Sequence, residues 1–241
     1  MSRTIIAVSG METTSYEFRR RLVEIADELG LNADYLATVI SFETGATFSP
    51  SERNPVSGCV GLIQFCGPAA VDAAKSAGLN YSSSEAQDWL SRMTPVEQLE
   101  YVKRYFKNVL KGRIGLSLTD TYMAVFSPAF IGKPESYVAY QEGQREYDQN
   151  SGFDRNPKDG KITVGEISSK ISAIYFDGIN RPRLPIGAPV TESGEYDSAP
   201  IPLFVFSIAV LAVGGVIGWG YGDVAVDFVR KQRWLSRAGS Q

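Results

Sequence analysis

Apolar residues recur at helical spacing along most of this chain, and capping residues or glycines interrupt them. The first such face covers residues 15–29 and is followed by Gly30, a helix stop signal. A second face covers residues 31–42, with Asn32 as a suitable N-terminal cap. The helix that it predicts ends at Glu43, so a carboxyl group stands where an apolar helix stops.

The same signals predict further helices downstream. Thr94-Pro95-Val96-Glu97 is a capping box with proline at the first helical position. By periodicity and capping we expect helices that open at Gly61–Phe65 and continue through 69–77, and that cover 98–110, 118–130 and 163–176. The expected fold class is therefore mainly α.

Residues 201–222 form a run of 22 residues without a charge. A helix of this length reaches about 33 Å, against about 30 Å for the hydrocarbon core of a bilayer. We therefore expect one transmembrane helix, because a buried core helix, the alternative, rarely runs this long without a charged position. Trp219 and Tyr221 stand at its end as interfacial anchors, and a basic segment follows.

Composition removes several kinds of chemistry. The chain has no histidine, which excludes Ser-His-Asp and Cys-His catalysis and histidine-ligated zinc. A net charge of -3 and a pI near 5.2 argue against nucleic acid as a partner. Cys59 and Cys66 have no metal-ligand spacing, and we expect reduced thiols slightly more than a disulfide.

Carboxylate chemistry remains, and Glu43 is its best candidate. Phe42, Phe48 and Phe65 would desolvate the Glu43 side chain and raise its pKa, as a general acid at neutral pH requires. The alternative is a solvated glutamate at a helix end. The turn residues Asn54-Pro55 and Ser57-Gly58, then Gly61-Leu62-Ile63-Gln64-Phe65, favour the catalytic interpretation.

This block resembles the goose-type lysozyme and soluble lytic transglycosylase superfamily over about twenty-five residues, and weakly as far as Tyr175. The resemblance implies a lysozyme-like helical domain in which Glu43 is the catalytic acid and Thr44 steadies it. It implies further that Gln64 hydrogen-bonds the sugar in a groove with Phe65. The family's Ala-Tyr-Asn motif is replaced here by a segment in which either Tyr122 supplies the phenol or Phe126 has replaced it.

The number of carboxylates in the site sets the expected mechanism. Ordinary glycosidases need two, and only Glu43 is clearly placed. With one acid, the sugar's own N-acetyl group and 6-hydroxyl can give a 1,6-anhydro product, and the resemblance to lytic transglycosylases favours this route on peptidoglycan. Glu52, Asp120 or Asp148 could supply a second carboxylate for a hydrolytic muramidase. A third alternative is a glycan-binding structural protein without catalysis.

Residues 154–166 resemble a calcium loop with one residue inserted. Asp154, Asn156, Asp159 and Glu166 would be its oxygen donors, so structural calcium is one expectation and no cofactor is required for the reaction. The alternative, at even odds, is a hydrogen-bonded turn in which Asp159 caps the following helix.

The expected organisation has five parts: an N-terminal arm (1–14), the catalytic domain (15–177), a proline-containing linker (178–200), the transmembrane helix (201–222) and a basic tail (223–241). Positive charge after the span predicts a cytoplasmic C-terminus and an external, periplasmic-side catalytic domain. The start is too short for a signal peptide, so delivery in a phage particle is one route. Gly214, Gly218 and Gly222 could mediate self-association, or be merely common membrane-helix glycines.

Overall fold

The computed structural model describes residues 3–55, 57–155 and 158–187. Within this part the chain is mainly helical, as expected. The α-helices are α1 (Tyr16–Leu29), α2 (Ala33–Glu43), α3 (Gly67–Ser76), α4 (Ser83–Ser91), α5 (Pro95–Leu110), α6 (Leu118–Phe126), α7 (Arg145–Asn150) and α8 (Val164–Ile179). The shorter elements are β1 (Thr4–Ile5), η1 (Met11–Thr13), η2 (Pro128–Phe130), β2 (Val138–Gln141), η3 (Ser151–Phe153), β3 (Lys161–Thr163) and β4 (Leu184–Pro185).

Side-chain caps set several helix starts where the sequence predicts them. The Ser15 hydroxyl accepts from the amide of Phe18 and begins α1, and the Asn32 side chain begins α2. Thr94 and Glu97 form the predicted capping box of α5. These caps satisfy amides that have no partner inside the helix, so short polar segments fix where the apolar faces begin.

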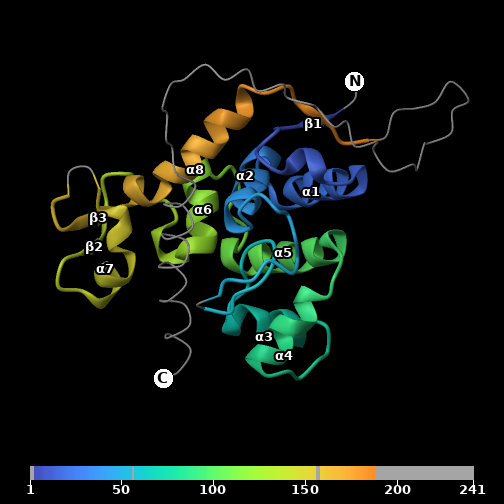
Figure 1. Ribbon diagram of the computed structural model, residues 1–241, viewed down its shortest axis with the longest axis horizontal. Helices are drawn as coiled ribbons and strands as arrows, with labels where there is room; N and C mark the ends of the chain where they lie inside the picture. Colours follow the sequence, from blue (N-terminus) through green and yellow to red (C-terminus); the bar gives the residue numbers. More distant parts are fainter. Residues whose placement is uncertain (1–2, 56, 156–157, 188–241) are drawn as a thin grey trace, which may run out of the picture.

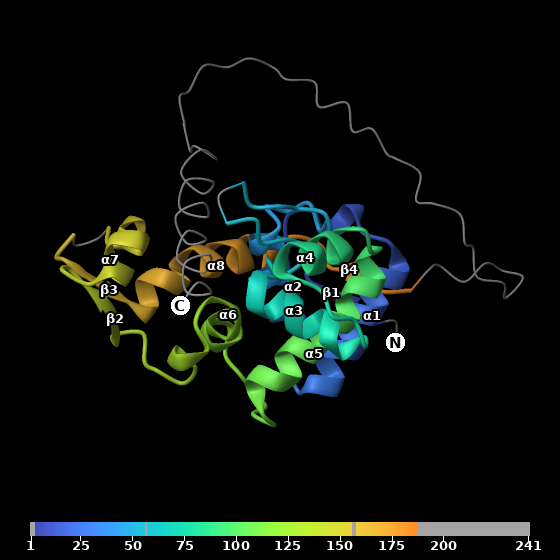
Figure 2. The same cartoon turned by 90° about the horizontal axis from the view of Figure 1, so that it is seen from below.

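The helices pack around two apolar clusters that meet at α2. The larger cluster joins α1, α3, α4 and α5 to one side of α2, while the smaller joins α6, α7, α8 and the β2–β3 hairpin to the other. Leu36 and Ile40 enter the first cluster, and Val39 and Phe42 enter the second. The α7 and β2–β3 elements lie at one end of the described body and α1 at the other (Figure 1). The view from below shows the same separation (Figure 2).

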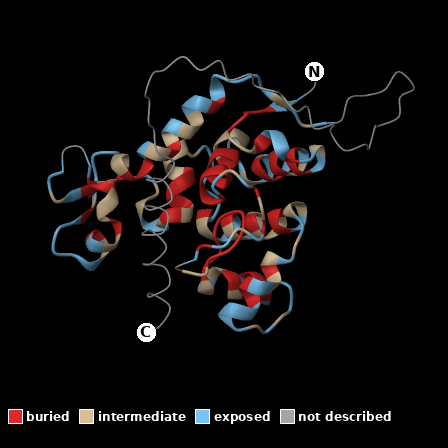
Figure 3. Cartoon of the chain, viewed as in Figure 1, coloured by how far each residue is buried: buried red, intermediate tan, exposed pale blue. Residues whose placement is uncertain are grey.

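The two ends of the described chain pair with each other. β1 and β4 are antiparallel, with Ile5 opposite Leu184. Ile5, Ile6 and Val8 are fully buried, and the buried segments gather along α2 and its neighbours (Figure 3). The residues expected as an N-terminal arm thus contribute to the core, and residues expected as linker add a strand.

Arginine side chains hold this pairing. Arg183 donates to both carboxylate oxygens of Asp34 at 2.8 and 2.9 Å and to the backbone of Thr4. Arg19, almost fully buried, donates through Nε to the carbonyl of Pro185 and through Nη1 to that of Thr14. Burial lowers the pKa of Arg19, since the apolar surroundings disfavour its charge.

Two predicted elements differ from the structure, and two helices of the structure were not predicted. Residues 61–64 form a turn inside an irregular antiparallel segment, with bridges Arg53–Val60 and Val60–Phe65, so the predicted helix opening there is wrong and α3 begins only at Gly67. The predicted 118–130 helix stops at Phe126, because a residue before proline avoids helical geometry and Ser127 precedes Pro128. Helices α4 and α7 were not predicted.

The predicted transmembrane helix (201–222), the basic tail (223–241) and Gly214, Gly218 and Gly222 lie outside the described residues. So does the linker beyond residue 187. Among the residues that the structure does describe, no helix combines the length and apolar character needed to cross a bilayer.

Candidate active site

Glu43 is the last residue of α2 and lies between the two apolar clusters. Its side chain is fully buried, although the helix that carries it ends there. The neighbouring Phe42 enters the smaller cluster and Phe65 the larger, so aromatic groups stand on both sides of the acid. A buried carboxyl group between two packed units is unusual for a structural glutamate.

The negative charge of Glu43 contributes to the raised pKa of two tyrosine side chains. Burial, and then the negative charge of Glu43, raises the pKa of Tyr105 to about 12. The same two causes, in the same order, raise the pKa of the fully buried Tyr122 well above its usual value. Tyr105 lies on α5 and Tyr122 on α6, so phenols from two elements flank the acid.

Aromatic contacts connect these groups. Phe42 meets Tyr122 edge to face with ring centroids 5.4 Å apart, and Phe65 meets Tyr105 in the same way at 6.3 Å. Phe126 packs on Tyr122 at 5.8 Å. Each edge-to-face pair fixes ring orientation, so the phenols are held beside Glu43 by packing. The structure therefore brings Glu43, Phe65, Tyr122 and Phe126 into one neighbourhood.

The hydroxyl of Thr44 serves the turn after α2. It donates to the carbonyl of Ile40 at 2.8 Å and accepts from the amide of Phe48 at 3.1 Å. Thr44 is almost fully buried. Both partners of the Thr44 hydroxyl are backbone groups. Through these two bonds, Thr44 therefore positions Glu43 only by fixing the backbone at the end of the helix.

Backbone strain is concentrated in this turn and in the Gln64 loop. Four residues other than glycine have positive φ in the described chain, and three of them, Ala46, Phe48 and Gln64, lie in these two segments. Such conformations cost free energy and persist where the surroundings impose them, often at functional sites. The N-terminal segment imposes one of them, because Gly10 packs directly on the carbonyl of Ala46.

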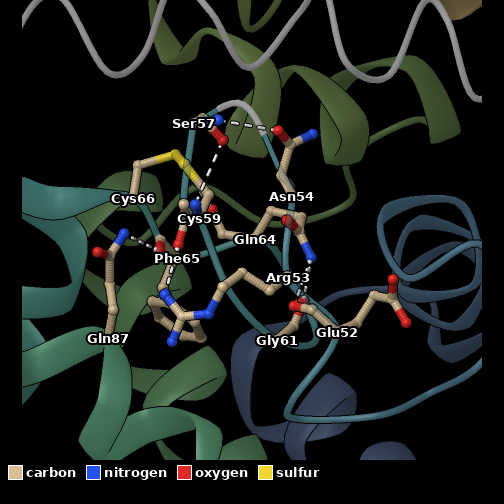
Figure 4. The surroundings of a disulfide bond; sticks show 11 residues. Glu52, Arg53, Asn54, Ser57, Cys59, Gly61, Gln64, Phe65, Cys66 and Gln87 are labelled. Atoms are coloured by element: carbon tan, nitrogen blue, oxygen red, sulfur yellow. Dashed lines mark hydrogen bonds between the residues drawn. A yellow bond between two sulfur atoms is a disulfide. The ribbon is translucent and has the colours of Figure 1, made fainter. Parts of the chain in front are cut away.

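Gln64 lies in the loop between α2 and α3 and is almost fully buried. Its Nε2 donates to the carbonyls of Glu52 at 3.2 Å and Gly61 at 3.1 Å (Figure 4). Both amide hydrogens are thereby used. Its Oε1 is buried and has no hydrogen-bond partner within the described part of the chain, so one acceptor of this amide is left unsatisfied.

A disulfide joins Cys59 to Cys66, with their Cα atoms 4.3 Å apart (Figure 4). The prediction of reduced thiols was therefore wrong. Val60 and Phe65 exchange backbone hydrogen bonds and bring the two cysteines, which flank them, together. The sequence spacing left this distance undetermined because a turn, rather than a helix start, separates them. The bond closes the loop that carries Gln64.

The other carboxylates proposed as a second acid have their own contacts. Glu52 is half-buried and accepts from the hydroxyl of Thr47 at 3.1 Å. Asp120 accepts from the amide of Gly132 and from Ser117, near the start of α6. Asp148 is exposed on α7. Of all carboxylates in the described residues, Glu43 alone is a cause of the raised pKa of both flanking tyrosines.

The calcium-like segment has donors that are already engaged. Asp154 accepts from the amides of Asp159 and Gly160 and from the hydroxyl of Tyr147, and these bonds, with Tyr147 first, lower its pKa. Glu166 caps α8 together with Thr163, so the alternative of Asp159 as that cap is wrong. Asn156 lies outside the described residues. Within them, no group of three or more acidic, cysteine or histidine side chains is arranged to hold a metal.

A surface pocket of about 220 Å³ lies at the start of α8. It is lined by Phe153, Arg155, Gly165, Glu166, Ser169 and Lys170. Of the predicted site residues only Glu166 belongs to it, and its side chain caps the helix. The pocket is therefore separate from the Glu43 neighbourhood.

Sequence reasoning missed three residues that shape the site. Tyr105 was assigned no role, since a half-buried aromatic on an amphipathic helix normally belongs to the core. Gln98 and Gly10 position loops, and only the fold reveals what they touch. No family model, curated protein or solved structure matches this chain.

Proposed function

We propose that the protein is a lytic transglycosylase that cleaves the β-1,4 bond between N-acetylmuramic acid and N-acetylglucosamine in peptidoglycan, as the sequence resemblance to goose-type lysozymes and soluble lytic transglycosylases implies. The observation that carries the proposal is Glu43, a fully buried carboxyl group at a helix end between two phenols. Burial disfavours the charged form of a carboxyl group, and a general acid must hold its proton at neutral pH.

In this mechanism Glu43 protonates the leaving glycosidic oxygen, while the substrate's N-acetyl group attacks the anomeric carbon. Glu43 then accepts a proton from the sugar's 6-hydroxyl, whose oxygen attacks the anomeric carbon. The bond from that carbon to the N-acetyl oxygen breaks, so the N-acetyl group is restored and a 1,6-anhydro ring is closed. The role of a single acid is supported by the electrostatics, because only Glu43 among the described carboxylates acts on both Tyr105 and Tyr122. The buried oxygen Oε1 of Gln64 has no partner among the described residues, and a donor on the glycan would satisfy it.

The second candidate is a hydrolytic muramidase, and Glu52 favours it. Its carbonyl receives the Gln64 side chain, and its half-buried carboxylate lies on the same loop. A carboxylate there could activate water, as inverting glycosidases require. The two candidates differ in the product, since hydrolysis adds one water and the anhydro route adds none.

Location belongs to the same proposal. We place the domain on the outer side of a membrane, anchored through residues 201–222, in the host envelope or in a virion. The Cys59–Cys66 disulfide supports an oxidising surrounding, because such bonds are rare in the cytosol.

The test is digestion of purified peptidoglycan by the full chain, with mass spectrometry of the products. Wild type should release anhydro-ended fragments, and Glu43→Gln should lower the rate by at least roughly a hundredfold. Glu17→Gln, which neutralises an exposed glutamate on α1, is the matched control and should be active. Inactivity of both wild type and Glu43→Gln would support the non-catalytic glycan-binding protein, and equal activity of the two would exclude Glu43 as the catalytic acid.

Glu52→Gln separates the two enzymatic candidates. The transglycosylase should keep its anhydro product in this variant. A product heavier by one water in wild type, together with loss of activity in Glu52→Gln, would instead establish the hydrolase.

A further inference from the structure

Gln98 is a fully buried amide in the first turn of α5. Its Oε1 accepts from the amide of Leu62 at 2.7 Å, and its Nε2 donates to the carbonyls of Leu90 at 2.9 Å and Pro50 at 3.2 Å. Both hydrogens of the amide nitrogen are thereby used. One side chain therefore holds two points of the loop between α2 and α3 and the end of α4.

The loop backbone also packs on the Gln98 amide at Gly61. A Cβ atom added to Gly61 would lie 2.2 Å from Oε1 and 2.5 Å from Nε2 of Gln98, and Gly61 has a φ of 82°. Only glycine combines this conformation with so close an approach. The position of residues 61 and 62 is thus set by Gln98 from one side.

The same turn holds Gln64 from the other side. The carbonyl of Gly61 accepts from both the backbone amide and the Nε2 of Gln64, at 3.0 and 3.1 Å. The Gly61 amide in turn donates to the carbonyl of Glu52, the other acceptor for Gln64 Nε2. A series of polar contacts therefore connects Gln98 through Gly61 to Gln64. The last atom of the series, the buried Oε1 of Gln64, has no protein partner among the described residues.

We propose that Gln98 is a positioning residue for glycan binding: its amide fixes the Gly61–Leu62 turn and, through Gly61, the direction in which Gln64 Oε1 faces the sugar. This inference rests on the proposed function. Gln98 does not touch the reacting atoms, so it acts on how well the glycan is held. An interaction made equally in the bound substrate and in the transition state changes KM and leaves kcat unaltered.

The experiment measures kcat and KM of the full chain on soluble glycan strands from peptidoglycan. Gln98→Met keeps the side-chain length and removes all three hydrogen bonds. It should raise KM roughly tenfold, with kcat within about twofold of wild type. Gln64→Met should raise KM to a similar extent. Gln144→Met, at an exposed amide before α7, is the matched control and should change neither constant.

The double variant distinguishes positioning from mere stabilisation. If Gln98 acts through Gln64, Gln64→Met/Gln98→Met should be no worse than Gln64→Met alone, whereas independent effects would multiply. If Gln98→Met does not fold, Gln98→Glu takes its place, since it retains the acceptor for Leu62 and loses both donors. An unchanged KM in a folded Gln98 variant, or multiplied effects, would overturn the inference.

Binding gives a readout separate from catalysis. In the Glu43→Gln background, the affinity for a β-1,4-linked oligomer of N-acetylglucosamine should fall roughly tenfold on Gln98→Met, measured by calorimetry. Unaltered affinity overturns the positioning role while leaving the proposed activity intact. A wild-type chain that neither cleaves nor binds glycan overturns the proposed function and this inference with it.

Discussion

At the scale of single residues, the two tyrosine hydroxyls beside Glu43 differ in their surroundings. The hydroxyl of Tyr105 donates to the carbonyl of Ala124 at 2.9 Å, so its proton has a fixed acceptor. Tyr122 is fully buried on α6 and packs against Phe126. The sequence predicted Glu43 as the acid, and the family resemblance left either Tyr122 or Phe126 at the position of the phenol. It did not predict Tyr105, whose proximity to Glu43 depends on how α5 packs.

The two phenols should therefore respond differently to removal of the hydroxyl. We expect Tyr122→Phe to lower kcat on glycan strands roughly a hundredfold, because the phenol beside the acid is lost during proton transfer. Tyr105→Phe should cost about 1 kcal/mol in the free energy of unfolding, through its lost hydrogen bond, and should leave kcat nearly unaltered. Urea unfolding and steady-state kinetics measure both. A larger loss of kcat in Tyr105→Phe would reverse the assignment.

At the scale of elements, the capped helices α1, α2 and α5 were predicted, whereas α4 and the loop that carries Gln64 were not. Residues 61–65 have the apolar pattern of a helix start, but Leu62 and Ile63 are buried through a turn that depends on Gly61, Gln98 and the disulfide. These are contacts distant in sequence, which periodicity does not register. Helix α4 did carry a signal, since Ser82 and Glu85 form a capping box.

The contact of the N-terminal segment with the turn after α2 predicts a specific weakness. A Cβ at Gly10 would lie 1.8 Å from the carbonyl oxygen of Ala46, so Gly10→Ala should lower the free energy of unfolding by about 3 kcal/mol and reduce activity through Glu43. Gly112 has the same φ of 85° and open space around it. Gly112→Ala should cost only about 1 kcal/mol, as backbone strain. If thermal unfolding gives equal losses for Gly10→Ala and Gly112→Ala, a steric clash with the carbonyl of Ala46 is excluded as the cause.

The disulfide predicts a second effect on the same loop. It joins residues seven positions apart, and closing so short a loop should contribute about 2.5 kcal/mol by limiting the unfolded chain. Cys59→Ser/Cys66→Ser should therefore unfold at lower urea concentration and, if the loop orients Gln64, show a raised KM. Reduction of wild type with a thiol should reproduce both effects. If reduction leaves KM unchanged, the disulfide contributes to stability and does not orient Gln64.

At the scale of the whole molecule, each of the two apolar clusters contains a tyrosine whose phenol is largely buried. These phenols make the free energy of unfolding depend on pH in the alkaline range. The pKa of Tyr105 in the larger cluster and of Tyr140 in the smaller is raised to about 12, in both cases mainly by burial. An unfolded phenol titrates near its ordinary value of about 10. Between these values the unfolded chain releases protons that the folded chain keeps.

The sign of the pH dependence follows from that difference. Stability from the buried phenols is complete below about pH 10, and it falls as pH rises toward about 12, because the unfolded state binds fewer protons there. Tyr105 alone should account for a loss of about 2 to 3 kcal/mol over this interval. Tyrosinate absorbance and circular dichroism should therefore change together, as one unfolding transition. Relative to its own stability at neutral pH, Tyr105→Phe should lose less free energy of unfolding over this interval than wild type does. Ionisation of all tyrosines before any loss of helix would contradict the link between phenol ionisation and unfolding.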